Sequence, residues 1–146
     1  MNPSDIATRA EQLFEEGLAC SEAVMLAVGD EIVPDFDRSL IKLATPWAGG
    51  IAYGGSVCGS LAGGLMLIGL LHGRVSTDAS SKPALALARK FRTRFDAEFG
   101  SLLCGDITGG KFHRAGDRCR RTIRFTVETL LELLAEEGSG ALPENS

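Results

Sequence analysis

The sequence feature that most constrains the fold is an uncharged, glycine-rich run at residues 49–74, GGIAYGGSVCGSLAGGLMLIGLLHGR. It contains nine glycines and one cysteine, and it carries no acidic or basic residue before Arg74. Glycine costs about 1 kcal/mol per interior helix position relative to alanine, yet the second half has the length and apolar content of a helix. The run predicts a central helix over residues 56–73, capped by Ser56 and buried on all sides.

A transmembrane helix is the alternative interpretation of this run, because an uncharged stretch of this length can span a bilayer. Pro46 and four glycines make residues 45–55 a loop, which leaves about 17 residues for a helix, the short limit for a span. The N-terminus, MNPSDIATRAEQLFEEG, is charged and lacks the apolar core of an export signal. We therefore expect a cytoplasmic protein with no membrane association.

Helical spacing of apolar residues predicts further helices on both sides of the central one. The first is expected to begin after Ser4 and to end or bend at Gly17, and the next continues to Gly29. A short helix is predicted over residues 35–44, after the break at Pro34. The last is predicted over residues 117–137, with an inward face made of Ile123, Val127, Leu130, Leu131 and Leu134.

The helix that follows the central one has the clearest boundaries. Ser81 is a candidate N-cap, Pro83 falls in the first turn, and Gly100 ends the pattern. Its predicted buried stripe consists of Leu85, Ala88, Phe91, Phe95 and Phe99. No stretch alternates at the period of a strand, so the prediction is an all-α single domain at residues 1–137, a bundle of about five to six helices around the central one. Residues 138–146 are predicted to be a flexible tail.

The glycines of the central run have a packing interpretation. Gly55, Gly59 and Gly63 recur every four residues, and Gly64 and Gly69 extend the same smooth surface. A glycine face lets neighbouring backbones approach closely, as it does in membrane bundles. We expect this face to bring other segments against the start of the central helix.

The four cysteines, Cys20, Cys58, Cys104 and Cys119, are widely spaced. The chain has no C-x-x-C, which leaves thioredoxin-type chemistry and zinc ribbons without support, and no C-x-x-C-H for covalent haem. Cys58 and Cys119 lie just after predicted helix starts, Cys20 follows the Gly17 break, and Cys104 falls in a glycine-rich loop. Helix N-termini favour thiolates, so the pattern suits one thiol cluster. The alternative is four unrelated buried cysteines.

Other polar residues give weaker signals. His72, near the end of the central helix, is predicted to interact with the helix dipole. His113 lies between Cys104 and Cys119, where it could act as a ligand or proton donor rather than a surface residue. A basic stretch around Cys119 is predicted to be a solvated surface, with stabilisation of thiolates as the alternative; it comprises Lys111, Arg114, Arg118, Arg120, Arg121 and Arg124.

The order of these features resembles the C_GCAxxG_C_C family of redox-active proteins over nearly the whole chain. The most specific part is Cys58-Gly59-Ser60-Leu61-Ala62-Gly63, which is similar to the family's C-G-A-x-x-G motif, with Cys20 before it and Cys104 and Cys119 after it. Ser60 stands where the motif has alanine, a mild departure at a packing position. The resemblance implies a helical domain whose four cysteines form one redox or metal-binding site, and it fixes no reaction, substrate or cofactor.

Three functions remain open at this stage. The first is a thiol redox protein that forms disulfides or passes electrons to a partner protein. The second is a metalloprotein in which Cys20, Cys58, Cys104 and Cys119 bind zinc or an iron–sulfur cluster. The third is an interaction module whose cysteines only pack. Whether the chain is an enzyme or a homo-oligomer stays open, and its net charge of −4 with 6% aromatic residues predicts no nucleic-acid partner.

Two expectations concern the site itself. At least three cysteine sulfurs should lie close together, with Cα separations below about 7 Å for any pair that bonds. Cys58 should be the most acidic thiol when the cysteines are reduced and metal-free, because of its place at a helix start. Cys119 is the rival, because Arg118 and Arg120 flank it.

Overall fold

The computed structural model describes residues 1–110 and 116–139, and these ranges fold into helices and loops. The elements are α1 (Pro3–Glu15), α2 (Cys20–Ile32), the 3-10 helix η1 (Arg38–Trp47), α3 (Gly59–His72), α4 (Lys82–Phe99), the short α5 (Cys104–Thr108) and α6 (Asp117–Ser139). In the described ranges, strand-like pairing is limited to one antiparallel bridge between Val57 and Leu103. The predicted all-α class is confirmed. The part of the predicted tail at 140–146 lies outside the described residues.

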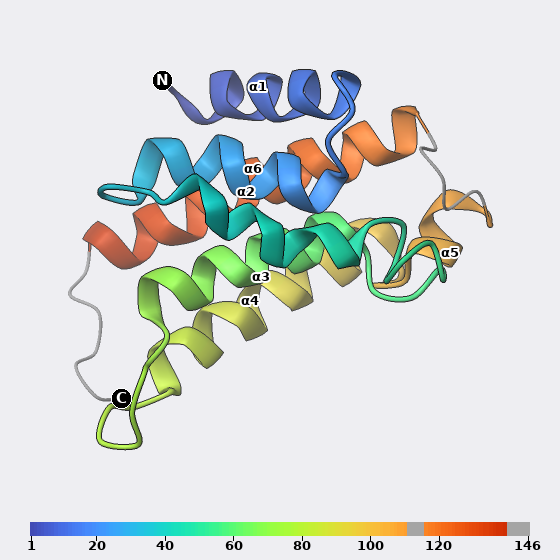
Figure 1. The fold of residues 1–146 in the computed structure, drawn as a ribbon. Coiled ribbons are helices and arrows are strands. Elements are labelled where there is room, and N and C mark those ends of the chain that lie inside the picture. Colours follow the sequence, from blue (N-terminus) through green and yellow to red (C-terminus); the bar gives the residue numbers. More distant parts are fainter. Residues whose placement is uncertain (111–115, 140–146) are drawn as a thin grey trace.

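The predicted central helix, α3, contacts α2, α4, α6 and η1. The long helices lie side by side, and α5 sits at one end of the bundle (Figure 1). Three of them, α2, α3 and α6, begin at this end and run away from it in the same general direction (Figure 1). Three helix N-termini therefore gather beside α5.

Helix α3 is shorter than the predicted span of residues 56–73. Its N-cap is Cys58 rather than Ser56, whose backbone forms hydrogen bonds with Gly50 in the preceding loop and with Cys104 at the start of α5. Residues 59–64 are all buried, whereas Leu70, near the end of the helix, is 42% exposed. The prediction of burial on all sides is therefore right only for the half that begins at the cysteine.

Glycines account for the close approach of α2 to α3. A Cβ atom added to Gly59 would lie 2.6 Å from Cys20 Sγ, and one added to Gly63 would lie 2.7 Å from the Ser21 carbonyl oxygen. Real Cβ contacts are not this short, so the two helices could not pack in this way around any larger residue. Gly69 meets nothing within 4 Å, which limits the packing role to the first turns of α3.

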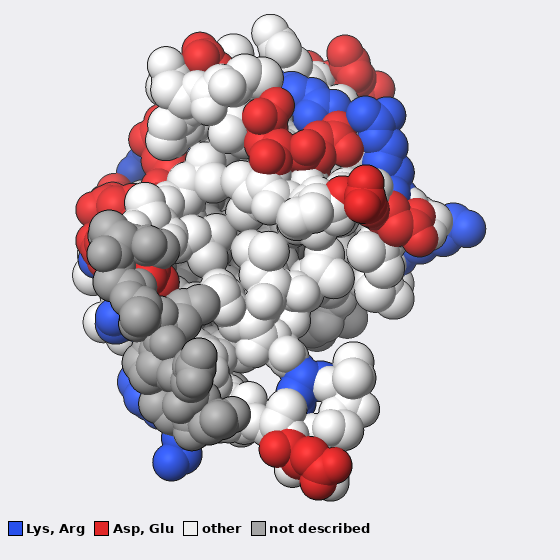
Figure 2. Space-filling view, turned by 90° about the vertical axis from the view of Figure 1, so that its left-hand side faces the viewer, with Lys and Arg blue, Asp and Glu red and all other residues white. Residues whose placement is uncertain are grey.

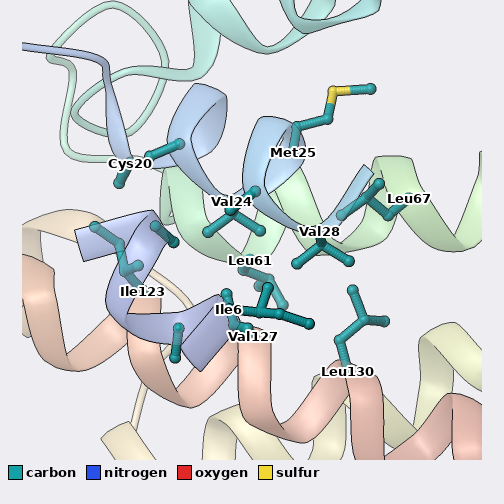
Figure 3. Close-up of a cluster of buried hydrophobic side chains, with 14 of the residues drawn as sticks. Ile6, Cys20, Val24, Met25, Val28, Leu61, Leu67, Ile123, Val127 and Leu130 are labelled. Carbon is teal, nitrogen blue, oxygen red and sulfur yellow. The ribbon is translucent and has the colours of Figure 1, made fainter. Parts of the chain in front are cut away.

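Buried side chains from α1, α2, α3, α4 and α6 form the core, part of which is drawn in Figure 3. Val24 and Val28 of α2 face Val127 and Leu130 of α6, and all four are fully buried. Cys20 lies at one end of this apolar row (Figure 3). Its sulfur therefore lies where the core meets the α5 end of the bundle.

Several helix boundaries differ from the predictions. Helix α1 is capped by Asn2, whose side chain accepts a hydrogen bond of 2.9 Å from the Asp5 amide, so Ser4 is not the cap. Helix α2 continues past Gly29, and the predicted α-helix at residues 35–44 is the 3-10 helix η1. Helix α4 begins after Ser81 and ends at Gly100, whose φ of 74° suits glycine, as predicted.

The buried faces of the last two long helices are also partly different. Leu85 of α4 is 56% exposed and Leu87 is buried in its place, together with Phe91 and Phe95. In α6, Leu133 is buried, whereas Leu131 and Leu134 are half-buried. The exposed Leu85 leaves an apolar groove between α3 and α4.

Charged side chains lie around the margin of the end away from α5, and the centre of that face is uncharged (Figure 2). Asp30, near the end of α2, forms ion pairs with Arg9 and Arg38 at 2.9 Å each. The pKa of its carboxyl group is lowered, because hydrogen bonds from the two guanidinium groups outweigh its burial. No described helix combines the length and the apolar character needed to cross a membrane.

Candidate functional site

A cavity at the α5 end of the bundle brings the four cysteines together. It offers about 30 Å³ to water-sized molecules, room for about one or two waters. Cys20, Cys58 and Cys104 are buried, and Cys119 is half-buried. The lining consists of Phe14, Ala19, Cys20, Ala48, Gly49, Tyr53, Cys58, Gly59, Cys104, Ile107, Thr108, Cys119 and Thr122.

Each cysteine lies at the start of a helix. Cys20 is the first residue of α2, Cys58 is the N-cap of α3, Cys104 is the first residue of α5, and Cys119 is in the first turn of α6. Cys20 follows the Gly17 break as predicted, whereas Cys104 was predicted to lie in a loop, and that prediction is wrong. Because the starts of α2, α3 and α6 gather beside α5, cysteines far apart in the sequence share one cavity.

Backbone hydrogen bonds hold Cys58 and Cys104 beside each other. The Cys58 amide donates to the Leu102 carbonyl at 2.8 Å, and the Cys104 amide donates to the Ser56 carbonyl at 2.7 Å. These bonds flank the Val57–Leu103 bridge, so the two cysteines are diagonal neighbours on one face of a short antiparallel pair. Diagonal neighbours have Cα atoms about 7–8 Å apart, and a disulfide needs less than about 7 Å. A small backbone shift would therefore allow them to bond.

Gly59, the residue after Cys58, allows the Cys20 side chain to lie close to the start of α3. The Cys20 sulfur lies where a side chain on Gly59 would project, and the Trp47 carbonyl oxygen lies 3.0 Å from the same point. This explains the unfavourable glycine at the first position of the central helix. It leaves room for a second sulfur beside the one that caps the helix.

Three hydroxyl groups lie beside the cysteines, Thr108 and Thr122 in the cavity lining and Ser60 next to Cys20 and Cys58, and their role was not predicted from the sequence. The Ser60 and Thr122 hydroxyls share a hydrogen bond of 3.0 Å, and the Thr122 hydroxyl also donates to the Cys119 carbonyl at 2.9 Å. The Thr108 hydroxyl donates to the Cys104 carbonyl at 2.7 Å. Ser60 is therefore more than a packing substitute for alanine. Its hydroxyl lies in an otherwise apolar run two residues after a cysteine, which was the available signal.

Burial keeps three of the cysteines protonated. It raises the pKa of Cys20 far above its ordinary value, with repulsion from the other cysteines adding to the rise and the Ser60 hydroxyl opposing it. It raises the pKa of Cys58 too, against the Leu61 and Ser60 amides and nearby hydroxyls, although no hydrogen bond of regular geometry caps the helix. It raises the pKa of Cys104 to about 11. The expectation that helix starts would favour thiolates here is wrong, because desolvation is the larger effect.

This burial predicts that the fold loses stability in alkaline solution. The Cys104 thiol releases its proton at a pKa of about 11 in the folded chain and 9.0 in the reference state. The contribution of this protonated thiol to the free energy of unfolding is complete below pH 9.0. It is lost as the pH rises through about 11, because the thiol ionises first in the unfolded chain. Urea unfolding across this interval should show a falling free energy of unfolding. The Cys104→Ala variant should show a shallower fall, and an equal slope in both proteins would contradict the assignment.

The loop between η1 and α3 is strained where it lines the cavity. Five consecutive residues, 49–53, have positive φ, and three of them are Ile51, Ala52 and Tyr53 with φ of 63°, 49° and 62°. A left-handed conformation costs about 1–2 kcal/mol at each residue that is not glycine. Hydrogen bonds from Ala52 to Pro46 and from Tyr53 to Ala48 hold it, at 2.9 and 2.8 Å. Such strain is typical of binding and catalytic sites.

The cysteine pattern on this scaffold matches a family model over residues 18–133, described as putative redox-active protein (C_GCAxxG_C_C). The chain belongs to the C_GCAxxG_C_C family. The match includes all four cysteines and the motif at residues 58–63, which forms the N-cap and first turn of α3. Comparison with curated proteins and with solved structures finds no match.

Metal binding is the second function considered above for the four cysteines, and the structure shows no group of side chains arranged for it among the described residues. Within residues 1–110 and 116–137, no three His, Cys, Asp or Glu side chains are arranged so that they could hold a metal ion. The four cysteines line the same cavity, but they do not form such a group. The binding of zinc or an iron–sulfur cluster by Cys20, Cys58, Cys104 and Cys119 stays a prediction.

The basic residues near Cys119 are used in ion pairs and hydrogen bonds. Arg118 donates to the Thr108 carbonyl at 2.6 Å, Arg120 pairs with Glu15 and Asp117, and Arg124 pairs with Glu11 at 2.5 Å. Arg121 lies over the Phe99 ring at 5.5 Å and pairs with Glu98 at 3.7 Å. These contacts tie α6 to its neighbours. Lys111, His113 and Arg114 lie outside the described residues, and His72 ends α3, where its dipole role stays a prediction.

Proposed function

We propose that this member of the C_GCAxxG_C_C family exchanges electrons as a thiol–disulfide protein, with Cys20, Cys58, Cys104 and Cys119 as one site. The observation that carries the proposal is that all four cysteines line one water-sized cavity. Diagonal pairing of Cys58 with Cys104, and the sulfur of Cys20 beside Gly59, support disulfide formation with little backbone movement. Packing alone requires no such convergence.

Differences in exposure suggest separate roles for the cysteines. Cys119 is half-buried, whereas Cys58 and Cys104 are 5% and 6% exposed. A partner's disulfide would therefore be attacked first by the Cys119 thiolate, which forms a mixed disulfide and releases one partner sulfur. Cys20 or Cys104 then attacks Cys119 Sγ and releases the second partner sulfur. The two protons lost by the cysteines go to the partner, which leaves as a dithiol.

Cys58 is the central member of the buried group. Among the cysteines it is the strongest electrostatic neighbour of both Cys20 and Cys104. An internal disulfide that forms at Cys119 can therefore move inward by exchange onto Cys58. The raised pKa of each buried thiol keeps this group neutral, so unspecific electrophiles react slowly with it.

Anaerobic purification with metal analysis, an absorption spectrum and disulfide mapping tests the proposal. We expect colourless, metal-free protein that forms internal disulfides on mild oxidation and returns to four thiols on reduction. Stoichiometric iron with a visible charge-transfer band, or stoichiometric zinc, would favour the metalloprotein instead. Thiols that never pair under oxidation would leave packing as their role.

A further inference from the structure

An apolar groove between α3 and α4 lies outside the thiol cavity. It has a volume of about 340 Å³ and is lined by Val57, Leu61, Leu65, Leu85, Ala88, Arg89, Arg92 and Leu102. Helices α3 and α4 lie side by side along it (Figure 1). Leu85 is 56% exposed, although three other large apolar residues of the same helix, Leu87, Phe91 and Phe95, are fully buried.

The groove has the spacing that an amphipathic helix requires. Leu61 and Leu65 are one turn apart on α3, and Leu85, Ala88 and Arg92 follow successive turns of α4. The α4 side spans about 10 Å at 1.5 Å per residue, which is about two helical turns. A docked helix would therefore place residues at i, i+3 or i+4, and i+7 between the two ridges.

Two arginines give the groove a positive rim. In the described part of the chain, Arg89 and Arg92 form no ion pair and no side-chain hydrogen bond. The basic residues on the other side of α4 are paired: Lys90 with Glu137 at 3.1 Å, and Arg94 with Glu136 at 3.3 Å. The chain has 19 acidic and 15 basic residues. Even so, none of the described acidic side chains forms an ion pair with Arg89 or Arg92.

We propose that this groove binds an acidic amphipathic helix of a partner protein, with its apolar face against the leucines and its carboxylates against Arg89 and Arg92. The groove ends at Val57 and Leu102, next to Cys58 and to the backbone bridge that holds Cys104. A helix bound there lies beside the thiol site. Binding in this groove requires no thiol chemistry, so it can be tested independently of the proposed redox function.

Titration with a synthetic helical peptide tests this proposal. The probe is an acetylated, amidated peptide of about 18 residues with leucines at i, i+3, i+4 and i+7 and glutamates beside them, long enough to be helical in water. We expect saturable binding with a Kd of about 10–100 µM and amide shift changes at Leu61, Leu65, Leu85 and Ala88 in nitrogen–proton spectra. The same peptide with lysine in place of glutamate should bind on the order of tenfold more weakly.

Matched variants separate the apolar and charged contributions. Leu85→Ser should weaken binding, whereas Leu43→Ser, at a leucine of η1 that is 61% exposed, should not. Arg92→Glu should weaken it on the order of tenfold, whereas Lys42→Glu, the same charge change outside the groove, should have little effect. These side chains are exposed, so the variants should keep the wild-type circular dichroism spectrum. Absence of binding, equal binding of the lysine peptide, or shifts elsewhere would overturn the proposal. Self-association that Leu85→Ser abolishes would assign the groove to a second copy instead.

Discussion

Replacing Gly63 with alanine is expected to lower the free energy of unfolding by up to about 2 kcal/mol. The new Cβ atom would lie 2.7 Å from the Ser21 carbonyl oxygen and 3.3 Å from Ser21 Cα. Both are backbone atoms, so relief requires a shift of the first turn of α2, which carries Cys20. Overpacking typically costs about 1–3 kcal/mol, and the better helix propensity of alanine returns about 1 kcal/mol.

Gly69→Ala is the matched control on the same helix. A Cβ atom there meets nothing within 4 Å, so the variant should be about 0.4–1 kcal/mol more stable than the wild type. Urea unfolding followed by circular dichroism measures both changes. If Gly63→Ala proves as stable as Gly69→Ala, the close contact of α2 with α3 is not what requires glycine. The reactivity of Cys20 in the Gly63→Ala protein would then be unchanged as well.

The all-α class could be predicted because apolar periodicity survives in a single sequence. Phe91 and Phe95 are buried on α4 as their spacing indicates, and Ile123, Val127 and Leu130 are buried on α6. The sequence does not determine which face of α4 is buried. Leu85 and Leu87 both fit an apolar stripe, and only the packing of the folded chain decides between them. The structure buries Leu87 and leaves Leu85 in the groove beside α3.

The grouping of the cysteines was predicted from their place at helix boundaries and from the family resemblance, but the details of the site were not. Cys58 caps α3 because Ser56 is held in the short antiparallel pair with Cys104, a contact between residues far apart in the sequence. Positive φ values at Ile51 and Tyr53 leave no sequence signal, since glycine is the residue that normally marks them. Tertiary contacts override local preference at each of these positions.

Burial also could not be predicted at the level that decides thiol chemistry. A helix N-terminus lowers a thiol pKa by a modest amount, usually less than one unit. Desolvation acts in the opposite direction and prevails at Cys20, Cys58 and Cys104. The rank of Cys58 against Cys119 as the most acidic thiol stays a prediction, to be measured by alkylation across pH.

Oxidants of different size are expected to separate Cys119 from Cys58. Cys119 is half-buried and Cys58 is 5% exposed, so a bulky aromatic disulfide, dithiobis(nitrobenzoic acid), should react mainly at Cys119. Cys119→Ser should slow this reaction on the order of tenfold or more, because access controls thiol exchange. Hydrogen peroxide is close to the size of water and fits the cavity of about 30 Å³. It should still drive an internal disulfide in that variant.

Cys58→Ser should give the opposite pattern, and this pairing is the stricter test of the site. The aromatic disulfide should react with it at the wild-type rate, because Cys119 is intact. Peroxide converts one thiol to a sulfenic acid, and a second thiol attacks its sulfur, which forms the disulfide and releases water; among the cysteines, Cys58 is the strongest electrostatic neighbour of both Cys20 and Cys104. We therefore expect the yield of disulfide within the buried group of Cys20, Cys58 and Cys104 to fall on the order of tenfold, while a disulfide to Cys119 can still form, as measured by peptide mass spectrometry without reduction. If Cys20 and Cys104 bond to each other in Cys58→Ser as readily as the buried cysteines pair in the wild type, Cys58 is not needed for exchange within the buried group, and the cysteine at the cap of the glycine-rich helix serves packing alone.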